Sequence, residues 1–382
     1  MGLLLFTRTY ICCRLWPHRF ESPHFLRKCF TSALYRCRTY GRYFLLSIIV
    51  VCVVHTLIST RRAHPYDRNG AVSDFRLGGE LVTSRRREFR PVKHCNIVNL
   101  TAPVDEEFNC VRTSTKPPTT VCLYDVFRDV YISHDLQETG VWEPLVTRDF
   151  LDVLARDPSA GVIDVGANIG FYSMLAASGG RDVVAVEPYR NSVRRLHKAV
   201  TLEDVTARVV IVENAVSDVR TAATVRRAGD NQGDTRIRHG AEPCMGSCSP
   251  VVRTVLLDDL LEACRFDRAI MKVDIQGYEH RAFAHAGALF DDIRMTYVFM
   301  EWVLMGRHYV AANHTSVDKT LVENMLKFLF ERNYRPYTLS SEGERPLDPD
   351  VWGAWPDDIV WHLMPNTVEY SKLIRTHFLN WP

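Results

Sequence analysis

Val162-Ile163-Asp164-Val165-Gly166-Ala167-Asn168-Ile169-Gly170-Phe171-Tyr172 is the stretch of sequence that decides the fold. Its apolar residues and two glycines predict a buried strand, a tight turn and the start of a helix. A second apolar strand, Val183–Val186, is followed by Glu187, about 20 residues past the turn. A carboxylate at that spacing is placed to accept hydrogen bonds from a ribose diol. The stretch therefore predicts half of a nucleoside-binding α/β fold.

The turn itself argues against a dinucleotide. A pyrophosphate requires close backbone approach and hence the order Gly-x-Gly-x-x-Gly, but Asn168 stands where the second of these glycines would be. S-adenosylmethionine has no phosphate, and it carries an ammonium group, a carboxylate and a ribose. Asp164 suits the ammonium, Gly166 allows the backbone to approach the ligand, and Glu187 suits the ribose hydroxyls. The turn alone is also typical of ordinary strand-to-helix connections, so the prediction depends on Glu187.

Strands and helices alternate along the rest of the chain. Apolar runs predict strands at 121–126, 130–133, 209–212, 270–274 and 297–301, and the last two near 337–339 and 359–362. Apolar residues at helical spacing predict helices at 145–155, 193–200 and 321–329. The polar segment 220–250 is expected to be an insertion or a hairpin. This alternation predicts an α/β fold with a mostly parallel, seven-stranded sheet and helices on both faces.

Four acidic residues stand where predicted strands end, namely Asp164, Glu187, Asp274 and Glu301. The carboxyl ends of parallel strands meet at one edge of a sheet, where ligands bind near the switch point of the strand order. A charge at the end of a buried strand costs free energy unless it has a partner. One such acid could cap a helix, but four at one edge are better explained as a site.

Four segments, in this order, resemble the FkbM-type S-adenosylmethionine-dependent methyltransferases. They are DVGANIGFYS at 164–173, ENAVSD at 213–218, LDDLL at 257–261 and MKVDIQGYE at 271–279. The resemblance covers about residues 121–361 and implies a Rossmann-like class I methyltransferase fold with O-methyl transfer, in several members to sugar or polyketide hydroxyls. It implies that the cofactor is bound by Asp164, Gly166, Asn168, Gly170, Glu187 and Asn214. Gln276 departs from the family pattern, because many members carry glutamate there, and this puts a metal or base role at that position in doubt.

Asp274, Lys272 and Glu301 are the predicted catalytic residues. The methyl group of a sulfonium is already activated, so the protein must mainly position the acceptor oxygen and take its proton. Asp274 is the predicted base. Lys272 lies on the same face of the strand and either holds the acceptor or pairs with Asp274, and Glu301 is a second acceptor ligand. Asp274 and Glu301 also suit a shared divalent cation, which the spacing does not demand.

Charge is distributed unevenly along the 382 residues. Residues 1–90 carry 16 Lys and Arg against 5 Asp and Glu, whereas the remainder carries 31 against 40. The folded part therefore lacks the basic surface that a nucleic-acid partner requires. Residues 43–58 form an apolar run, preceded by more basic residues than follow it, which predicts a signal anchor with the N-terminus in the cytosol.

This prediction divides the chain into a cytosolic tail at 1–42, the anchor at 43–58, a luminal stem at 59–118 and the methyltransferase domain at 119–382. The expected location is the Golgi or endoplasmic reticulum, as a single-pass type II membrane glycoprotein, and the alternative is a mitochondrial presequence. Sequons at Asn99 and Asn313 agree with a luminal body. Six cysteines after the anchor permit three disulfides, while Cys244 and Cys248 are expected to form a local bridge or remain free thiols.

The acceptor is expected to be a glycan or another small molecule of the secretory pathway, and Trp352-Gly353-Ala354-Trp355-Pro356 is a candidate acceptor platform or a packing element. Two other functions remain open. A luminal glycosyltransferase would use Asp348-Pro349-Asp350 as a metal site, but would leave Asn168 and Glu187 unexplained. A non-catalytic membrane protein that keeps the fold would not need the intact set of acids.

Overall fold

The computed structural model describes residues 76–77, 80–81, 91–227, 235–239, 250–306, 317–341 and 343–365. The chain divides into two units, Met1–Leu81 and Val82–Pro382. The first contains the short antiparallel pair β1 (Arg76–Leu77) and β2 (Glu80–Leu81). The predicted tail and anchor, 1–42 and 43–58, lie outside the described residues. Within the described ranges, no helix is both long and apolar enough to cross a membrane.

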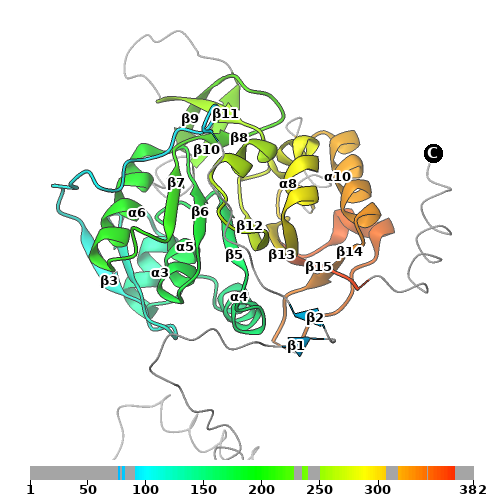
Figure 1. Ribbon diagram of the computed structural model, residues 1–382, viewed down its shortest axis with the longest axis horizontal. Coiled ribbons are helices and arrows are strands. Elements are labelled where there is room, and N and C mark those ends of the chain that lie inside the picture. Colours follow the sequence, from blue (N-terminus) through cyan, green and yellow to red (C-terminus); the bar gives the residue numbers. More distant parts are fainter. Residues whose placement is uncertain are drawn as a thin grey trace, which may run out of the picture. The chain divides into compact units, whose positions relative to one another are not determined.

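A seven-stranded sheet forms the centre of the second unit (Figure 1). Its order is β7 (Val209–Val212), β6 (Val183–Val186), β5 (Gly161–Val165), β12 (Arg268–Val273), β13 (Arg294–Glu301), β15 (Asp358–Leu363) and β14 (Tyr334–Thr338). The pairs from β7 to β13 are parallel, and β15 runs antiparallel to both of its neighbours. The predicted mostly parallel, seven-stranded sheet is confirmed. Its order reverses between β5 and β12, which is where ligands bind in such sheets.

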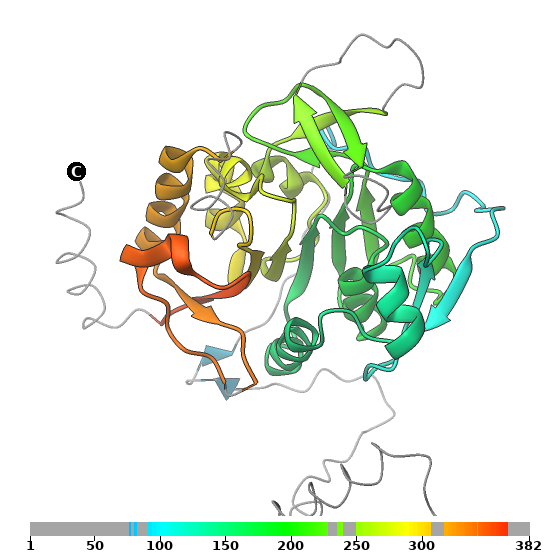
Figure 2. The same ribbon diagram turned by 180° about the vertical axis from the view of Figure 1, so that it is seen from behind.

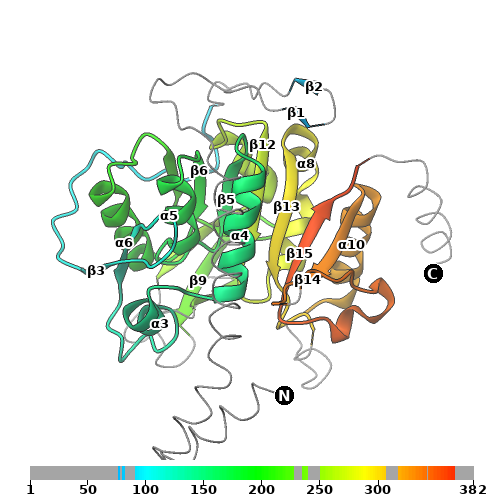
Figure 3. The same cartoon turned by 90° about the horizontal axis from the view of Figure 1, so that it is seen from below.

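Helices cover both faces of this sheet. Alternate residues of β5 point to opposite faces, so Val162 packs in one apolar core and Ile163 in the other. The core around Val162 contains α4 (Pro144–Arg156), α5 (Phe171–Ser178) and α6 (Arg190–Leu202), which Figure 3 shows along one face. The other core contains η1 (Leu257–Glu262), α7 (Glu279–Ala282), η2 (Phe283–His285), α8 (Gly287–Asp292), α10 (Lys319–Glu331) and η3 (Pro349–Ala354).

A smaller sheet stands at one end of the large one (Figure 2). Its order is β10 (Thr235–His239), β9 (Ala222–Arg227), β11 (Val251–Val255) and β8 (Ala215–Val216). β9 and β10 pair antiparallel, which confirms the hairpin predicted within 220–250.

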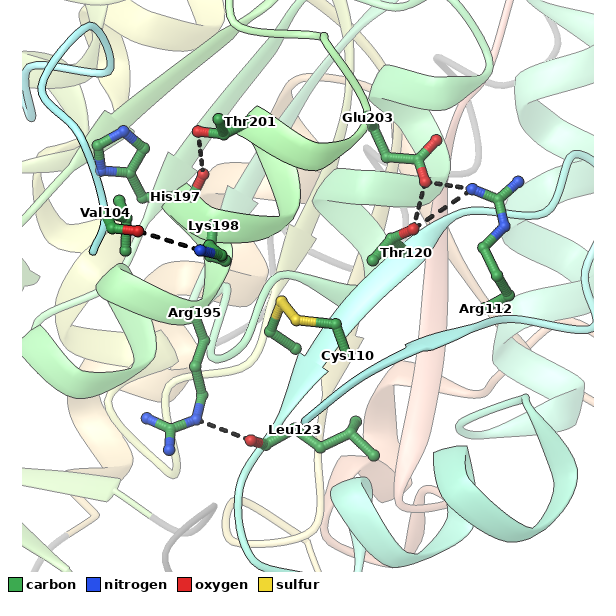
Figure 4. The surroundings of a disulfide bond; sticks show 11 residues. Val104, Cys110, Arg112, Thr120, Leu123, Arg195, His197, Lys198, Thr201 and Glu203 are labelled. Carbon is green, nitrogen blue, oxygen red and sulfur yellow. Dashed lines mark hydrogen bonds and ion pairs between the residues drawn. A yellow bond between two sulfur atoms is a disulfide. The ribbon is translucent and has the colours of Figure 1, made fainter. Parts of the chain in front are cut away.

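The segment before residue 119, predicted as stem, contributes strand β3 to the second unit. β3 (Asn109–Arg112) pairs antiparallel with β4 (Thr120–Leu123), and Cys110 is joined to Cys122 by a disulfide. Figure 4 shows how α6 holds this hairpin: Arg195 Nε donates to the Leu123 carbonyl oxygen at 3.0 Å, and Glu203 pairs with Arg112. The predicted domain boundary at 119 therefore does not coincide with the edge of this compact unit, which begins at Val82.

Two further expectations are corrected or limited by the structure. The strand predicted at 130–133 is wrong, because α3 (Ile132–Thr139) begins there. The Asp129 carboxylate accepts from the Ser133 backbone nitrogen and hydroxyl at 3.0 and 2.5 Å, which favours a helical first turn over an extended strand. Among the described cysteines, Cys110 and Cys122 form the disulfide, and Cys95 and Cys264 are buried. One of the three permitted disulfides is therefore seen within the described residues. Cys244 and Cys248 lie outside the described residues.

Candidate active site

A cavity of about 270 Å³ opens where β5, β6, β12 and β13 end, at the reversal of the strand order. Its lining includes eight of the predicted site residues: Asp164, Gly166, Asn168, Glu187, Asn214, Lys272, Asp274 and Glu301. Parallel pairing brings them together from segments far apart in the sequence. Gly170 does not line this cavity. A Cβ on Gly170 would lie 2.2 Å from Leu196 Cδ1, so this glycine allows α5 and α6 to pack closely.

The glycine turn is held by the strand beside it. The backbone nitrogens of Gly166 and Ala167 donate to the Val186 carbonyl oxygen at 2.9 and 3.0 Å. Gly166 has φ +89° and Asn168 φ +50°, both in the left-handed region. This conformation directs the Asn168 backbone nitrogen to Glu187 Oε2 at 2.9 Å. The turn and the acid that ends β6 are therefore one hydrogen-bonded unit.

Glu187 is buried, and each of its oxygens accepts one backbone hydrogen bond. Oε2 accepts from Asn168 and Oε1 from Tyr189, at 2.9 and 2.8 Å. Burial raises the pKa of Glu187 to about 7, against the lowering effect of these two bonds. A carboxylate oxygen has a second acceptor position, so the side chain retains capacity for two ligand hydroxyls.

Asp164 is also buried, at the end of β5. Its Oδ2 accepts from the Ser173 hydroxyl at 2.6 Å, which ties the strand to the first turns of α5. Burial raises its pKa, and the Ser173 hydrogen bond and the positive charge of Lys272 oppose this. Its register partner on β12 is Lys272, so the cofactor side and the predicted catalytic side of the cavity are adjacent.

Lys272 and Asp274 form an ion pair with a nitrogen–oxygen distance of 3.2 Å. The Lys272 side chain is 4% exposed, and its ammonium lies over the Tyr172 ring, 4.9 Å from the centroid. Burial alone would lower the pKa of Lys272. The carboxylates of Asp274, Glu143 and Asp358 outweigh this and raise the pKa, so the lysine is a fixed positive charge.

Gln276 lies between the two remaining acids of the rim. Its amide nitrogen donates to Asp274 Oδ1 at 3.1 Å and to Glu301 Oε2 at 3.2 Å, from a backbone with φ +55°. Burial, followed by the charges of Asp274 and Glu279, raises the pKa of Glu301 well above its ordinary value. An N–H donor repels a cation, so this arrangement does not fit a metal ion shared by Asp274 and Glu301.

The described residues contain one other cluster of metal-ligating types, His94, Asp259 and Glu262. Glu262 Oε2 already accepts from three consecutive backbone nitrogens, at residues 93, 94 and 95. Asp259 receives two hydrogen bonds from Arg220, at 2.9 and 2.7 Å. These bonds attach the segment around Cys95 to η1, and this explains the cluster without an ion.

The family model described as Methyltransferase FkbM domain matches residues 164–336, which include every predicted site residue. Residues 164–336 are an FkbM methyltransferase domain. No curated protein matches the sequence. The predicted family is thus confirmed, and the protein is a methyltransferase.

Several solved structures resemble the fold at low identity. An O-methyltransferase from Bacillus cereus in complex with SAH is 12% identical, with 59% of this chain and 83% of that chain covered and a TM-score of 0.34. An O-methyltransferase from Streptomyces achromogenes involved in tomaymycin synthesis, in complex with SAM, is 12% identical, with 64% and 100% covered and a TM-score of 0.33. Similarities of this size do not identify site residues or an acceptor. The strand order and the family match confirm the predicted Rossmann-like class I methyltransferase fold.

Within the FkbM domain, Asn214 has a structural role that the sequence did not indicate. Its amide oxygen accepts from the Asn96 backbone nitrogen at 2.7 Å, and its amide nitrogen donates to the Arg253 carbonyl oxygen at 3.0 Å. It therefore shapes the cavity wall through the backbone.

The predicted aromatic platform does not line the cavity. Trp352 and Trp355 are 8% and 2% exposed and pack against Trp302 in the core below β15. Asp348 caps η3, where its Oδ1 accepts from the Asp350 backbone nitrogen at 3.0 Å. Neither acid of that pair lines the cavity, so the metal site of the glycosyltransferase alternative finds no counterpart there.

The lining residues that were not predicted from the sequence include Tyr131, Trp142, Glu143 and Tyr172. Tyr172 donates its hydroxyl hydrogen bond to Glu143 Oε2 at 2.6 Å. Glu143 stands just before α4, far from the FkbM segments. Its one local signal is the Glu-Pro pair at the start of a predicted helix.

Proposed function

We propose that this protein is an S-adenosylmethionine-dependent O-methyltransferase that methylates a hydroxyl of a glycan in the secretory pathway. The observation that carries the proposal is one cavity shared by two groups of residues. Glu187 and the Gly166 turn form one group, and the ion pair of the buried Lys272 with Asp274 forms the other.

Gly166, Asn168 and Glu187 hold the cofactor in this proposal. Glu187 accepts the two ribose hydroxyls with the acceptor positions that its backbone bonds leave. Gly166 provides the close backbone approach, and Asp164 contributes negative charge for the ammonium. When bound, S-adenosylmethionine supplies an activated methyl group on a positively charged sulfur.

Asp274 takes the hydroxyl proton while the acceptor oxygen displaces the sulfonium sulfur from the methyl carbon. Lys272 orients Asp274 through their 3.2 Å contact, and Gln276 fixes its other oxygen. The Lys272 ammonium also contacts the face of the Tyr172 ring, which holds the ammonium in position. Because these groups are held in advance by neighbours, little reorganisation is needed when the acceptor binds.

The secretory setting is inferred from residues 43–58 and from the sequons. Asn99 is exposed, and its side-chain oxygen accepts from the Thr101 hydroxyl at 2.8 Å. Full-length protein expressed in cells should lose apparent mass on endoglycosidase treatment, and Asn99→Gln should shorten that shift. If endoglycosidase does not change the apparent mass and the protein is found in mitochondria, the presequence alternative is favoured.

The direct test offers the full-length protein radiolabelled S-adenosylmethionine or a labelled sugar nucleotide. Transfer from the methyl donor alone supports the proposal, and transfer from the sugar nucleotide would favour a glycosyltransferase. Mass spectrometry of glycans from cells with and without the protein then identifies the acceptor by a methyl-sized mass increase. If calorimetry detects no binding of S-adenosylmethionine, the non-catalytic alternative gains instead.

A further inference from the structure

Glu143 has a strained backbone. Its φ and ψ are 43° and 69°, in the left-handed region, and Pro144 follows it. A side chain with a Cβ is disfavoured in this region, and the residue before a proline normally adopts an extended conformation. Strain of this kind is retained mainly where function requires the geometry. Here it places the Glu143 carboxylate on the wall of the cavity.

A chain of contacts connects Glu143 to the rim carboxylate Asp274. The Tyr172 hydroxyl donates to Glu143 Oε2 at 2.6 Å. The Tyr172 ring lies 4.9 Å from the Lys272 ammonium, which in turn contacts Asp274 at 3.2 Å. Tyr172 is buried in the core around Val162, where close packing holds its ring in place. The two carboxylates thus face one cavity at positions fixed by a common lysine and tyrosine.

Two aromatic side chains line the same cavity as Glu143. Trp142 and Tyr131 both line the cavity, and Tyr131 is 60% exposed. Phe127 and Val130, on the loop just before Tyr131, are 88% and 51% exposed. Indole and phenol rings combine a flat apolar face with a polar tip, and this suits a ligand with an apolar face and a polar edge. A sugar ring has this form.

The charges around Glu143 disfavour an anionic acceptor. Glu143 and Asp274 contribute carboxylates to the lining, and Lys272, already paired with Asp274, is the single lysine or arginine among the lining residues. Like charges at a buried surface disfavour an incoming anion. A neutral polyhydroxyl ligand avoids this cost, because its hydroxyls donate to carboxylates.

We propose that Tyr131, Trp142 and Glu143 form the acceptor subsite and that it takes an uncharged sugar ring. Trp142 and Tyr131 contact the apolar face of the ring, and Glu143 accepts from one hydroxyl so that a second hydroxyl faces Asp274. This assignment rests on the proposed methyl transfer to a glycan. It adds which end of the cavity the acceptor occupies and which sugars it rejects.

Saturation-transfer NMR on the full-length protein with S-adenosylhomocysteine tests the subsite. The probes are the methyl glycosides of glucose, galactose and mannose, with methyl glucuronide as the charged partner of the glucoside. At least one neutral glycoside should bind in the millimolar range and the glucuronide should not. Trp142→Ala and Glu143→Gln should each weaken the neutral glycoside about tenfold or more, which corresponds to about 1.4 kcal/mol.

Glu138→Gln, an exposed glutamate on α3, is the matched control and should leave glycoside binding unchanged. Calorimetry with S-adenosylhomocysteine separates the two proposals: affinity within twofold of wild type in all variants shows that the cofactor side is intact. Tyr131→Ala, at an exposed position, serves if Trp142→Ala does not fold. Glucuronide binding equal to the glucoside, unchanged glycoside affinity in the variants, or no glycoside binding to a protein that binds the cofactor would each overturn the subsite. A wild-type protein that does not bind S-adenosylhomocysteine would instead overturn the proposed function.

Discussion

The backbones of Gly166 and Asp274 approach so closely that a Cβ on Gly166 would stand 1.8 Å from the Asp274 carbonyl oxygen. The Asp274 nitrogen also donates to the Val165 carbonyl oxygen at 2.9 Å. The turn that follows β5 and the end of β12 are thereby fixed against each other. This contact joins the proposed cofactor side of the cavity to the proposed catalytic side.

Gly166→Ala should destabilise the protein by several kcal/mol, because overpacking and a positive φ both oppose a Cβ there. Thermal unfolding followed by circular dichroism measures the loss. Gly180→Ala is the matched control, since Gly180 has φ +84° but no atom within 4 Å of an added Cβ. It should cost only about 1–2 kcal/mol, the ordinary penalty for a Cβ in the left-handed region. Equal melting temperatures for the two variants would show that the Gly166–Asp274 contact does not constrain the turn.

Glu187→Gln should weaken S-adenosylhomocysteine binding by about 10-fold to 100-fold, because charge-assisted hydrogen bonds to the ribose are lost. The pKa of Glu187 is raised to about 7 by burial. Ligand hydroxyls bind its ionised form, so wild-type affinity should rise as pH increases through 7 and level off above it. Calorimetry between pH 6 and pH 8.5 measures this, and the Glu187→Gln substitution should remove that part of the dependence. Wild-type affinity that falls with pH over this range would contradict the assigned role.

Asp274→Asn should retain cofactor affinity but lower turnover by at least about 100-fold, since a positioned base typically contributes that much. Lys272→Met should lower turnover as well, because the ion pair orients Asp274. Turnover is measured by release of S-adenosylhomocysteine once an acceptor is known. A fully active Asp274→Asn enzyme would exclude Asp274 as the base, whatever the result for Lys272.

Glu279→Gln should stabilise the protein at high pH. Glu279 is buried, its Oε1 accepts from the Ile275 nitrogen, and Oε2 has no hydrogen-bond partner. Burial raises its pKa from 4.5 to about 7. A raised pKa means that its stabilising contribution is fully present below pH 4.5 and is lost as pH rises through 7, at a cost on the order of 3 kcal/mol.

Melting temperatures at pH 5 and pH 8 test this sign. The difference between Glu279→Gln and wild type should be larger and more positive at pH 8. The exposed Glu138→Gln substitution should show no such change with pH. A variant that gains more at pH 5 than at pH 8 would contradict the raised pKa.

Replacing both Cys110 and Cys122 by serine should lower the free energy of unfolding by about 3 kcal/mol, the loop-closure value for a separation of 12 residues. Urea unfolding measures the change. The wild-type protein with its disulfide reduced should have the same free energy of unfolding as the double variant.

Maleimide labelling of the native protein should spare Cys95 and Cys264, which are buried. Rapid labelling of both cysteines in the native protein would show that the core around Cys95 and Cys264 opens readily.

The sequence predicted the central features of the site because they are local. A buried strand, a glycine turn and an acid at the next strand end are encoded within 26 residues, from 162 to 187. Parallel pairing then requires that Asp164, Glu187, Asp274 and Glu301 meet at one edge, since each follows or ends a strand of the same sheet. The helix at α4, the hairpin of β9 and β10 and the seven strands were predicted for the same reason.

Residue chemistry alone did not distinguish lining residues from packing residues. Trp352 and Trp355 are of a residue type that commonly stacks on sugars. In the structure, however, η3 and the residue after it direct both side chains into the core. Asn214 lies in a family-like segment, yet its amide is used by two backbone groups. Such assignments depend on the direction of a side chain, which no local pattern specifies.

The sequence by itself determined an α/β methyltransferase fold and a rim of acids. This was possible because the spacing of apolar residues and the residue types of turns are properties of neighbouring residues. Only the tertiary structure brought Glu143 and Trp142 to the cavity that contains Lys272. It did so through a strained Glu-Pro backbone and a buried tyrosine hydroxyl. This hydroxyl joins residues that are 29 positions apart in the sequence, and the contact forms only when α4 packs against the sheet.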